Sequence, residues 1–253
     1  MKTVVCLKQV PARDAPLRVD AAGRWVDESE LAFEINEPDA YALEAALQLK
    51  EKHGGEVVVL TAGPARAAQS IREALAKGAD RAIHIEMENL DKWDTLGVAS
   101  AMARALEPEK ADLILTGLQS DDLGNGQTGV VLAELLGLPH ATLIVQVEKL
   151  DGAVRVKREL EDGWFETIEI PLPALLTIQS GIARLRYATL MGIKKAKTKE
   201  IRRFTAEDAA PATIEIARVY APQKTKQTEM LAGNAQEAAA KLVERLKFGA
   251  RVL

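Results

Sequence analysis

The chain has 253 residues, 47% of them hydrophobic, which is enough to bury one large core. A formal net charge of −4 and an aromatic content of 4% argue against a nucleic-acid partner. Cys6 is the single cysteine, which excludes an intrachain disulfide, and no apolar run reaches the ~18 residues of a membrane span, so we expect a soluble, cytoplasmic protein without membrane insertion.

The first part of the chain alternates between continuous apolar runs and segments with helical spacing of alanine and leucine. Continuous apolar runs are typical of strands buried on both faces, and glycine or proline closes each helical segment. The alternation therefore predicts a parallel sheet covered by helices on both sides. The predicted strands are residues 2–10, 56–64, 81–87 and 111–117, and the predicted helices are residues 38–55, 65–79 and 94–108, with a short helix from about residue 127.

Short strands joined by turns follow this alternating part. Asp151-Gly152 and Asp162-Gly163 are hairpin signals, so residues 141–179 predict an antiparallel extension of the same sheet. After about residue 204 the regular pattern is lost, apart from a short strand predicted at residues 213–220 and an amphipathic helix predicted at residues 235–249. That helix can fold back on its own domain or dock on a partner, and the sequence leaves both possibilities open.

The residue patterns of common catalytic and metal sites do not occur in this sequence. His53, His84 and His140 share no metal-ligand spacing with one another or with Cys6. No G-x-S-x-G motif is present, so a hydrolase serine is unsupported. Cys6 lies in an apolar strand, and we interpret it as a small buried hydrophobe instead of a reactive thiol. The sequence therefore predicts a protein without catalytic residues and without a metal.

A glycine-rich loop precedes the short helix. Gly124, Gly126 and Gly129 have the G-x-G-x-x-G spacing, and backbone amides at the start of a helix can bind an anion without any side chain. Gln127 and Thr128 can add an amide and a hydroxyl to a phosphate. The loop therefore predicts a nucleotide site, although a tight strand-to-helix turn that binds nothing has the same pattern.

Alternatively, this loop could bind the dinucleotide of an NAD-dependent oxidoreductase. Its glycines would directly follow the first strand of a βαβ unit. Here they follow the fourth predicted strand, after the further residues Leu118 to Leu123, and no second βαβ half follows them. Asp121 and Asp122 would repel a phosphate lying against them, so they fit better as acceptors for ribose hydroxyls or as caps that hold the loop.

Four segments of the chain are expected to meet at one edge of the predicted sheet. Ligands of open parallel sheets bind beyond the carboxyl ends of the strands, at the point where the strand order reverses. The segments could surround one nucleotide, or they could be the ordinary strand-end loops of any α/β fold. They are Lys8–Val10, Asn36–Asp39, Thr61–Gly63 and Gly117–Thr128.

The most specific match to a known family is "VKRELEDGWFETIEIPLPALLT", residues 156–177. It resembles a signature made of a basic residue, an acidic-glycine turn, an acid and then P-x-aliphatic-aliphatic-T. "RYATLMGIKKAKTKEI", residues 186–201, is similar to the segment that follows in the same family. On these residues the chain resembles the beta subunit of electron transfer flavoprotein over essentially its full length. The matching signature residues are Arg158, Glu161, Asp162, Gly163, Glu166, Pro173, Leu175, Leu176 and Thr177.

The resemblance implies a three-layer α/β fold with an open, mostly parallel, Rossmann-like sheet that binds an adenine nucleotide. It implies a nucleotide-binding domain at residues 1–203 and a C-terminal arm at residues 204–253 that docks on an alpha subunit. The alpha subunit would hold most of an FAD, and the beta subunit would bury AMP as a structural ligand. The pair would carry electrons from acyl-CoA and related dehydrogenases, as in fatty acid oxidation, to a membrane quinone oxidoreductase.

The AMP contacts implied by the resemblance lie on the same predicted sheet edge. Gly126 stands where many relatives have asparagine, and Asn125 is next to it. Gln127, Thr128 and Gly129 favour AMP over the second FAD that flavin-bifurcating relatives bind at this place. Carried over by position, the contacts are Cys6 through its backbone, Asn36, Glu37, Pro38, Asp39, Ala62, Gly117, Leu118, Gln119, Ser120, Asp121, Asp122, Leu123, Gly124, Asn125, Gly126, Gln127 and Thr128.

Residues 178–200 resemble the loop through which the family recognises its redox partners. Leu190 falls at the anchoring leucine, which would fill an apolar pocket on a dehydrogenase. Charges at the rim of such a contact tune the encounter rate more than the affinity, which suits a carrier that must release quickly. The rim residues implied by the resemblance are Lys194, Lys195 and Lys197.

Overall fold

The computed structural model describes residues 1–206, 209–223 and 228–252. Its contacts divide the chain into two compact units, Met1–Val219 and Tyr220–Leu253. The first unit contains a nine-stranded sheet and a separate two-stranded sheet. Among the helices described, none combines the length and the apolar character that crossing a membrane requires.

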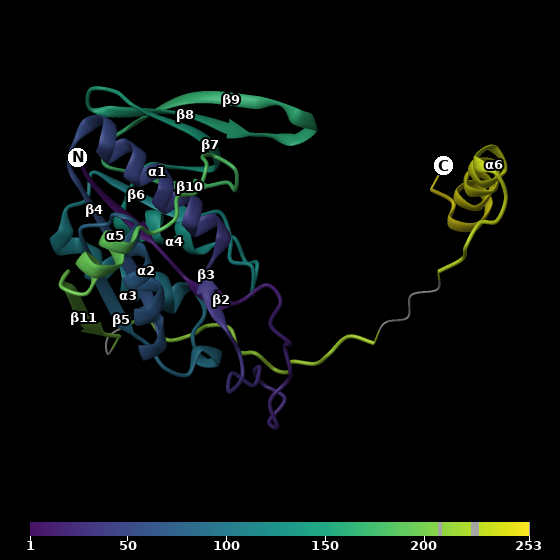
Figure 1. Cartoon of the computed structure of the whole chain (residues 1–253), viewed down its shortest axis with the longest axis horizontal. Helices are drawn as coiled ribbons and strands as arrows, with labels where there is room; N and C mark the ends of the chain where they lie inside the picture. The colour runs from purple at the N-terminus through teal and green to yellow at the C-terminus, as the bar shows by residue number, and fades with distance from the viewer. Residues whose placement is uncertain (207–208, 224–227, 253) are drawn as a thin grey trace. The chain divides into compact units, whose positions relative to one another are not determined.

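The main sheet has the strand order β11-β5-β4-β1-β6-β10-β7-β8-β9 (Figure 1). Neighbouring strands from β11 to β7 pair in parallel, whereas β7, β8 and β9 pair antiparallel. This confirms the expected open, mostly parallel sheet with an antiparallel extension. Its strands are β1 (Lys2–Cys6), β4 (Glu56–Gly63), β5 (Arg81–Glu86), β6 (Leu113–Gly117), β7 (His140–Lys149), β8 (Ala153–Glu159), β9 (Phe165–Pro171), β10 (Ala174–Ile178) and β11 (Ile201–Thr205).

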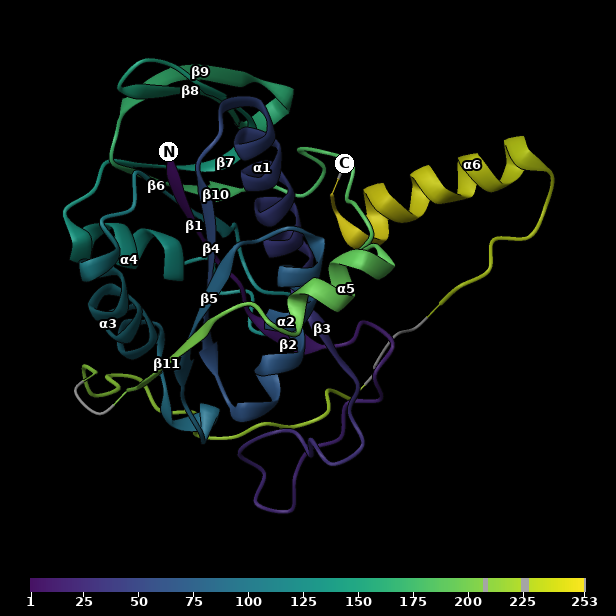
Figure 2. The ribbon, with the colours of Figure 1, turned by 60° about the vertical axis from the view of Figure 1, so that its left-hand side comes forward.

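Helices cover both faces of this sheet (Figure 2). Helices α1, α2 and α5 pack on the face to which Val5 and Val59 point, and α3 and α4 pack on the face to which Val4 and Val58 point. Successive residues of a strand point to opposite faces, so the continuous apolar runs supply both cores. The three layers of the expected fold are therefore present. The helices are α1 (Glu37–His53), α2 (Ala68–Lys77), α3 (Thr95–Leu106), α4 (Thr128–Leu136) and α5 (Leu190–Ala196).

The first predicted strand is wrong in its length. Residues 2–10 form two strands: β1 ends at Cys6, and β2 (Gln9–Pro11) pairs antiparallel with β3 (Phe33–Ile35) in the small second sheet. The run is broken at Lys8, whose backbone N–H donates to the Asp39 carboxylate instead of to a neighbouring strand. The apolar character of the run predicts one continuous strand, but the hydrogen bond to Asp39 ends the pairing of β1 with its neighbours before Lys8.

Three further differences concern the later strands. β10 does not join the antiparallel extension, because it lies between β6 and β7 and pairs in parallel with both. β11 pairs in parallel with β5 and was not expected, and it runs across residue 203, the expected end of the nucleotide-binding domain. Conversely, residues 213–220 form no strand, since the Asp94 carboxylate accepts hydrogen bonds from the Thr213 and Ile214 amides. The domain boundary at residue 203 itself stays a proposal.

The second compact unit, Tyr220–Leu253, contains the expected terminal helix. Helix α6 (Ala235–Glu244) starts with a capping box in which the Asn234 side chain accepts from the Glu237 amide and Glu237 reaches back to the Asn234 amide. A π-helical turn, Arg245–Ala250, continues it. Large apolar side chains on these two helical segments are exposed, namely Leu242, Val243 and Phe248.

Asp94 caps α3 and also holds the chain at residue 213. One carboxylate oxygen accepts from the Gly97 amide at 2.8 Å, and the other accepts from the Thr213 amide at 2.6 Å and the Thr213 hydroxyl at 2.8 Å. Burial raises the pKa of Asp94, but these hydrogen bonds outweigh it and hold the pKa below its ordinary value. A carboxyl with a lowered pKa stabilises the fold above its unfolded-state pKa of about 3.9, and this contribution is lost as the pH falls through the folded-state pKa.

We expect Asp94→Ala to lower the free energy of unfolding by about 1–2 kcal/mol at pH 7, because the cap of α3 and the tether of residue 213 are both removed. Urea unfolding of the variant and the wild type checks this value. The difference should shrink as the pH falls below about 4, because Asp94 is protonated first in the unfolded state and then, below its lowered pKa, in the folded state as well. Asp14→Ala, in an exposed turn, is the control and should change little; a loss in D94A no larger than in this control would contradict the assignment.

Candidate functional site

The strand order reverses between β1 and β6. From β1 the chain builds outward through β4 and β5, and it then crosses to the other side of β1 to form β6. The loops that leave the carboxyl ends of β1 and β6 therefore run to opposite faces of the sheet. In open α/β sheets this switch point is where ligands bind. The N-terminal end of α1 and the loop of residues 118–127 both lie at this point, because hydrogen bonds tie them to the ends of β1 and β6.

A buried carboxylate joins the two strand ends. Asp39, in the first turn of α1, is only 6% exposed. Its Oδ2 accepts from the Lys8 amide at 2.7 Å, just after β1, and its Oδ1 accepts from the Gly117 amide at 2.8 Å, at the end of β6. A Cβ at Gly117 would overlap Asp39 Oδ1 and lie 2.7 Å from Pro38 Cβ, so only glycine permits this approach.

Burial and hydrogen bonding shift the pKa of Asp39 in opposite directions. Burial raises the pKa of Asp39 to about 7, against the amide hydrogen bonds from Lys8 and Gly117, which favour the ionised form. The neighbouring Cys6 is also buried, and burial together with the Asp39 charge raises the pKa of its thiol. Cys6 is thus held as the neutral thiol, as expected for a small buried hydrophobe.

Asn36 fixes the first half of the glycine-rich loop. Its side chain is buried, its Nδ2 donates to the Gln119 carbonyl at 2.9 Å, and its Oδ1 accepts from the Asp121 amide at 2.9 Å. Asp121 Oδ2 in turn accepts from the Glu37 amide at 3.4 Å. The start of α1 and the loop after β6 are therefore held together by side chains from both segments.

Lys8 also belongs to this cluster, although nothing in the sequence predicted a role for its side chain. Its Nζ donates to Asp122 Oδ1 at 2.6 Å and to Ser120 Oγ at 3.3 Å. Burial raises the pKa of Asp122, but the charge of Lys8 and the hydrogen bonds from Lys8, Ser120 and Leu123 together outweigh it and leave that pKa below its ordinary value. Asp122 also accepts from the Leu123 amide at 2.7 Å, so it acts as a cap of the loop, one of the two roles considered for it.

The second half of the loop has the backbone that an anion site requires. Gly124 and Gly126 both have φ of 63°, in the left-handed region that favours glycine. α4 then begins at Thr128, and no side chain caps it, so its first-turn amides lack a cap acceptor. A Cβ at Gly129 would lie 2.7 Å from Thr116 Oγ1, which shows how closely α4 approaches β6. Free amides behind side-chain-free residues fit a phosphate group.

The strand order argues against the dinucleotide use of this loop. In a dinucleotide-binding βαβ unit, the two strands joined by the helix belong to one consecutive half of the sheet, and the glycines follow its first strand. Here α4 leads from β6 to β7, and β10 lies between these two strands. Among the described residues, no group of three or more His, Cys, Asp or Glu side chains is arranged to hold a metal ion.

The segment expected to recognise partners contains a short helix. Thr189 Oγ1 accepts from the Gly192 amide at 3.0 Å and caps α5, Leu190–Ala196. Leu190, its first residue, is 88% exposed, whereas Ala196 is buried against the core. The lysines expected at the rim, Lys194, Lys195 and Lys197, are all exposed.

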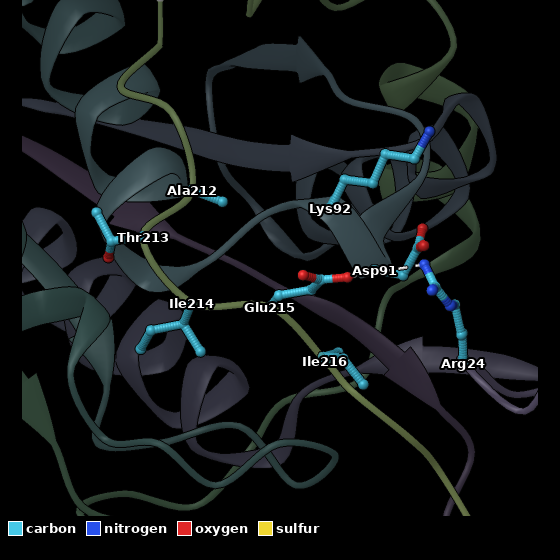
Figure 3. Close-up of a pocket in the computed structure, with 8 residues that line it drawn as sticks. All are labelled: Arg24, Asp91, Lys92, Ala212, Thr213, Ile214, Glu215 and Ile216. Carbon is cyan, nitrogen blue, oxygen red and sulfur yellow. Dashed lines mark ion pairs between the residues drawn. The ribbon is translucent and has the colours of Figure 1, made fainter.

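A separate open pocket lies elsewhere in the first unit (Figure 3). It has a volume of about 480 Å³, and Arg24 and Glu215 form an ion pair at 3.8 Å in it. The extended segment of residues 212–216 forms one side of it. No residue of the nucleotide site expected from the sequence lines this pocket. Its lining is Arg24, Asp91, Lys92, Ala212, Thr213, Ile214, Glu215 and Ile216.

Comparison with known proteins agrees with this architecture. A family model described as "Electron transfer flavoprotein domain" matches residues 24–209. The electron transfer flavoprotein subunit beta of Methylophilus methylotrophus is 36% identical over 257 residues, which cover 96% of this chain and 97% of that protein. That of Thermoanaerobacterium thermosaccharolyticum is 35% identical over 97% and 98% of the two chains. The mitochondrial subunit beta of Oryza sativa subsp. japonica is 37% identical over 100% of both.

We expect Asp39→Asn to weaken the joint between β1 and β6, because the amide nitrogen would face one of the two N–H donors. At about pH 4 Asp39 is a neutral acid that still presents two oxygens to these donors, whereas asparagine presents one. An unsatisfied buried donor costs about 1–3 kcal/mol, which urea unfolding at this pH should show. A raised folded-state pKa means that Asp39 stabilises the fold most below its unfolded-state pKa, and that this stabilisation falls as the pH rises towards about 7. The advantage of the wild type over D39N should therefore narrow between pH 4 and pH 7.

Asp151→Asn, in an exposed hairpin turn, is the matched control for this variant. It should leave the free energy of unfolding nearly unchanged across the same pH range. A difference between wild type and D39N that stays constant from pH 4 to pH 7 would contradict the raised pKa, and the absence of any difference at pH 4 would contradict the joint itself.

Proposed function

The chain belongs to the electron transfer flavoprotein beta subunit family, and we propose that it pairs with an alpha subunit to form a heterodimer that holds one FAD and one AMP. In this proposal the alpha subunit holds most of the FAD, which supplies the redox chemistry when bound. The chain described here contributes the nucleotide site and a docking surface for redox partners. It acts as part of an electron carrier and catalyses no bond chemistry of its own.

The switch point of the sheet supports the AMP part of this proposal. The first-turn amides of α4, with Gln127 and Thr128, would hold the phosphate, because they lack a capping side chain. Asn36 and Asp39, from the start of α1, would lie along the rest of the nucleotide. Lys8 offsets the negative charge of Asp122 in this region, which reduces the repulsion that a phosphate would meet.

The docking part of the proposal is carried by one observation, the exposure of Leu190 at the start of a capped helix. A large apolar side chain held clear of its own core can fill a pocket on another protein, and such anchors supply much of the binding energy of an interface. The exposed lysines nearby would attract an acidic rim and speed the encounter. We infer that the partners are acyl-CoA and related dehydrogenases as donors and a membrane quinone oxidoreductase as acceptor, in the cytoplasm.

The C-terminal arm is the proposed contact with the alpha subunit. Leu242, Val243 and Phe248 are exposed on the helical segments of the second compact unit. Several large apolar side chains exposed on one short segment are typical of a segment that packs on a partner. The proposed arm begins after residue 203, as the family resemblance implies.

We expect coexpression with an alpha subunit to give a yellow 1:1 complex. Denaturing this complex should release about one AMP and one FAD per heterodimer, because the AMP is enclosed at the switch point. Mass spectrometry and absorbance of the released nucleotides measure both. Release of two FAD and no AMP would assign the site to a flavin-bifurcating relative instead, and the absence of any nucleotide beyond one FAD would contradict the proposed site.

We expect Leu190→Ala to lower kcat/KM for reduction of the complex by an acyl-CoA dehydrogenase by about tenfold, because an interface anchor is lost. The FAD content should stay the same. Leu17→Ala, which truncates another exposed leucine far along the chain from α5, is the matched control and should leave the rate unchanged. Equal rates for wild type and L190A would contradict the docking role of α5.

A further inference from the structure

One arginine attaches the chain to α1 just before the docking helix α5 begins. Arg186 Nε and Nη2 donate to the two oxygens of Glu44 at 2.8 and 2.9 Å. Its Nη1 and Nη2 also donate to the two oxygens of Glu51 at 2.5 and 3.1 Å. Glu44 and Glu51 both belong to α1, so a single planar guanidinium fixes the chain just before α5 to the side of α1.

This arginine lies between a buried carboxylate and an exposed one. The Glu44 side chain is 5% exposed, and that of Glu51 is 59% exposed. Burial raises the pKa of Glu44, but hydrogen bonds from Arg186 and Gln48 and the charge of Arg186 together outweigh this and hold the pKa below its ordinary value. Arg186 is therefore the counter-charge that a buried Glu44 requires, and its position is fixed by that requirement.

The other end of α5 is attached to α2 (Figure 2). Arg72 Nη1 donates to the carbonyls of Ala196 and Lys199 at 2.5 and 2.9 Å. Lys199 Nζ donates to the Leu75 carbonyl at 2.9 Å. Within the helix, a Cβ at Gly192 would overlap the Ala76 carbonyl oxygen, so the backbone of α5 lies directly against α2.

The large apolar side chains between these two attachments are exposed, whereas the small Ala188 and Ala196 pack against the core. Tyr187 directly follows Arg186 and is 93% exposed, and Leu190 and Met191 are also exposed. A helix of seven residues is too short to be stable by itself in water. The direction in which Leu190 points is therefore set by these attachments and by the close packing of Ala188, Gly192 and Ala196, and not by burial of the large apolar side chains.

We propose that Arg186 is the positioning residue of the docking helix, and that its clasp on Glu44 and Glu51 presents Leu190 in the orientation that a dehydrogenase binds. This inference rests on the proposed docking function of α5. A preformed docking surface avoids the loss of conformational freedom on binding, so its loss weakens association. Electron transfer within the docked complex depends on the flavins and not on Arg186, so the loss falls on KM and leaves kcat nearly unchanged.

The experiment uses the coexpressed heterodimer and an acyl-CoA dehydrogenase that reduces the wild type. Arg186→Ala should raise the KM for the heterodimer about fivefold to tenfold, while kcat stays within about twofold of the wild-type value. Arg186→Lys should have a smaller effect on KM, because lysine keeps the positive charge but lacks the planar guanidinium that donates to both carboxylates. Arg155→Ala is the matched control: Arg155 also pairs with two carboxylates, Glu148 and Glu169, but on β8 and its neighbouring strands. It should leave both constants unchanged.

A structural readout accompanies the kinetics. Trypsin cleaves after lysine, and α5 and the residue after it carry three exposed lysines, Lys194, Lys195 and Lys197. Freed from α1, the segment should be cut about tenfold faster in R186A than in the wild type or in R155A, since cleavage needs local unfolding. If R186A fails to form the heterodimer, Glu51→Gln carries the test instead. Glu51 is exposed, so its loss should spare the fold and still raise KM and the cleavage rate about twofold.

The outcomes separate this inference from the function on which it rests. If L190A raises KM and R186A does not, the positioning role is wrong and the docking role stands. If R186A is cut faster but both variants keep the wild-type KM, the docking role of α5 is wrong, and the inference fails with it. A rise in KM in R186A that equals the rise in R155A would mean a general effect of arginine loss, and would also overturn the inference.

Discussion

The carboxylate of Asp39 joins the two strands between which the sheet reverses its order. Its two oxygens accept from the amides of Lys8 and Gly117, so the end of β1, the end of β6 and the first turn of α1 are fixed by one side chain. Burial opposes the charge that makes these hydrogen bonds strong, and the pKa of Asp39 is raised to about 7 as a result. The candidate nucleotide site is built around this joint, because the loop of residues 118–127 begins at one of the two amides.

Helix α1 connects the two proposed activities of the chain. Its first turn carries Asp39 at the switch point, and its later turns carry Glu44 and Glu51, which hold Arg186 just before the docking helix. The same helix therefore positions both the candidate nucleotide site and the proposed docking surface. In the proposed function, the chain would influence electron transfer by determining where the partners meet. Rigid backbone attachment combined with free apolar side chains suits contacts that form and separate quickly.

The local sequence pattern was sufficient to predict strands that are buried on both faces and helices that are buried on one face. The strands β4, β5 and β6, the helices α1 to α4, and the convergence of Lys8, Asn36–Asp39 and Gly117 at one edge all follow from apolar runs and glycine positions. β10 and β11 could not be placed in this way, because their neighbours in the sheet are distant in the sequence and nothing local specifies parallel insertion. The side-chain roles of Lys8 and Arg186 depend on partners more than 100 residues away, Asp122 and Glu44, so no local pattern in the sequence could predict them.

A crystal structure of the heterodimer, grown without added nucleotide, tests the central claim most directly. The account predicts electron density for an adenylate at the switch point, with its phosphate at the first turn of α4 and the rest of it beside Asn36 and Asp39. The account would be contradicted by density for water alone at this place, with the Lys8–Asp122 ion pair intact. A nucleotide bound at another edge of the sheet would contradict it equally.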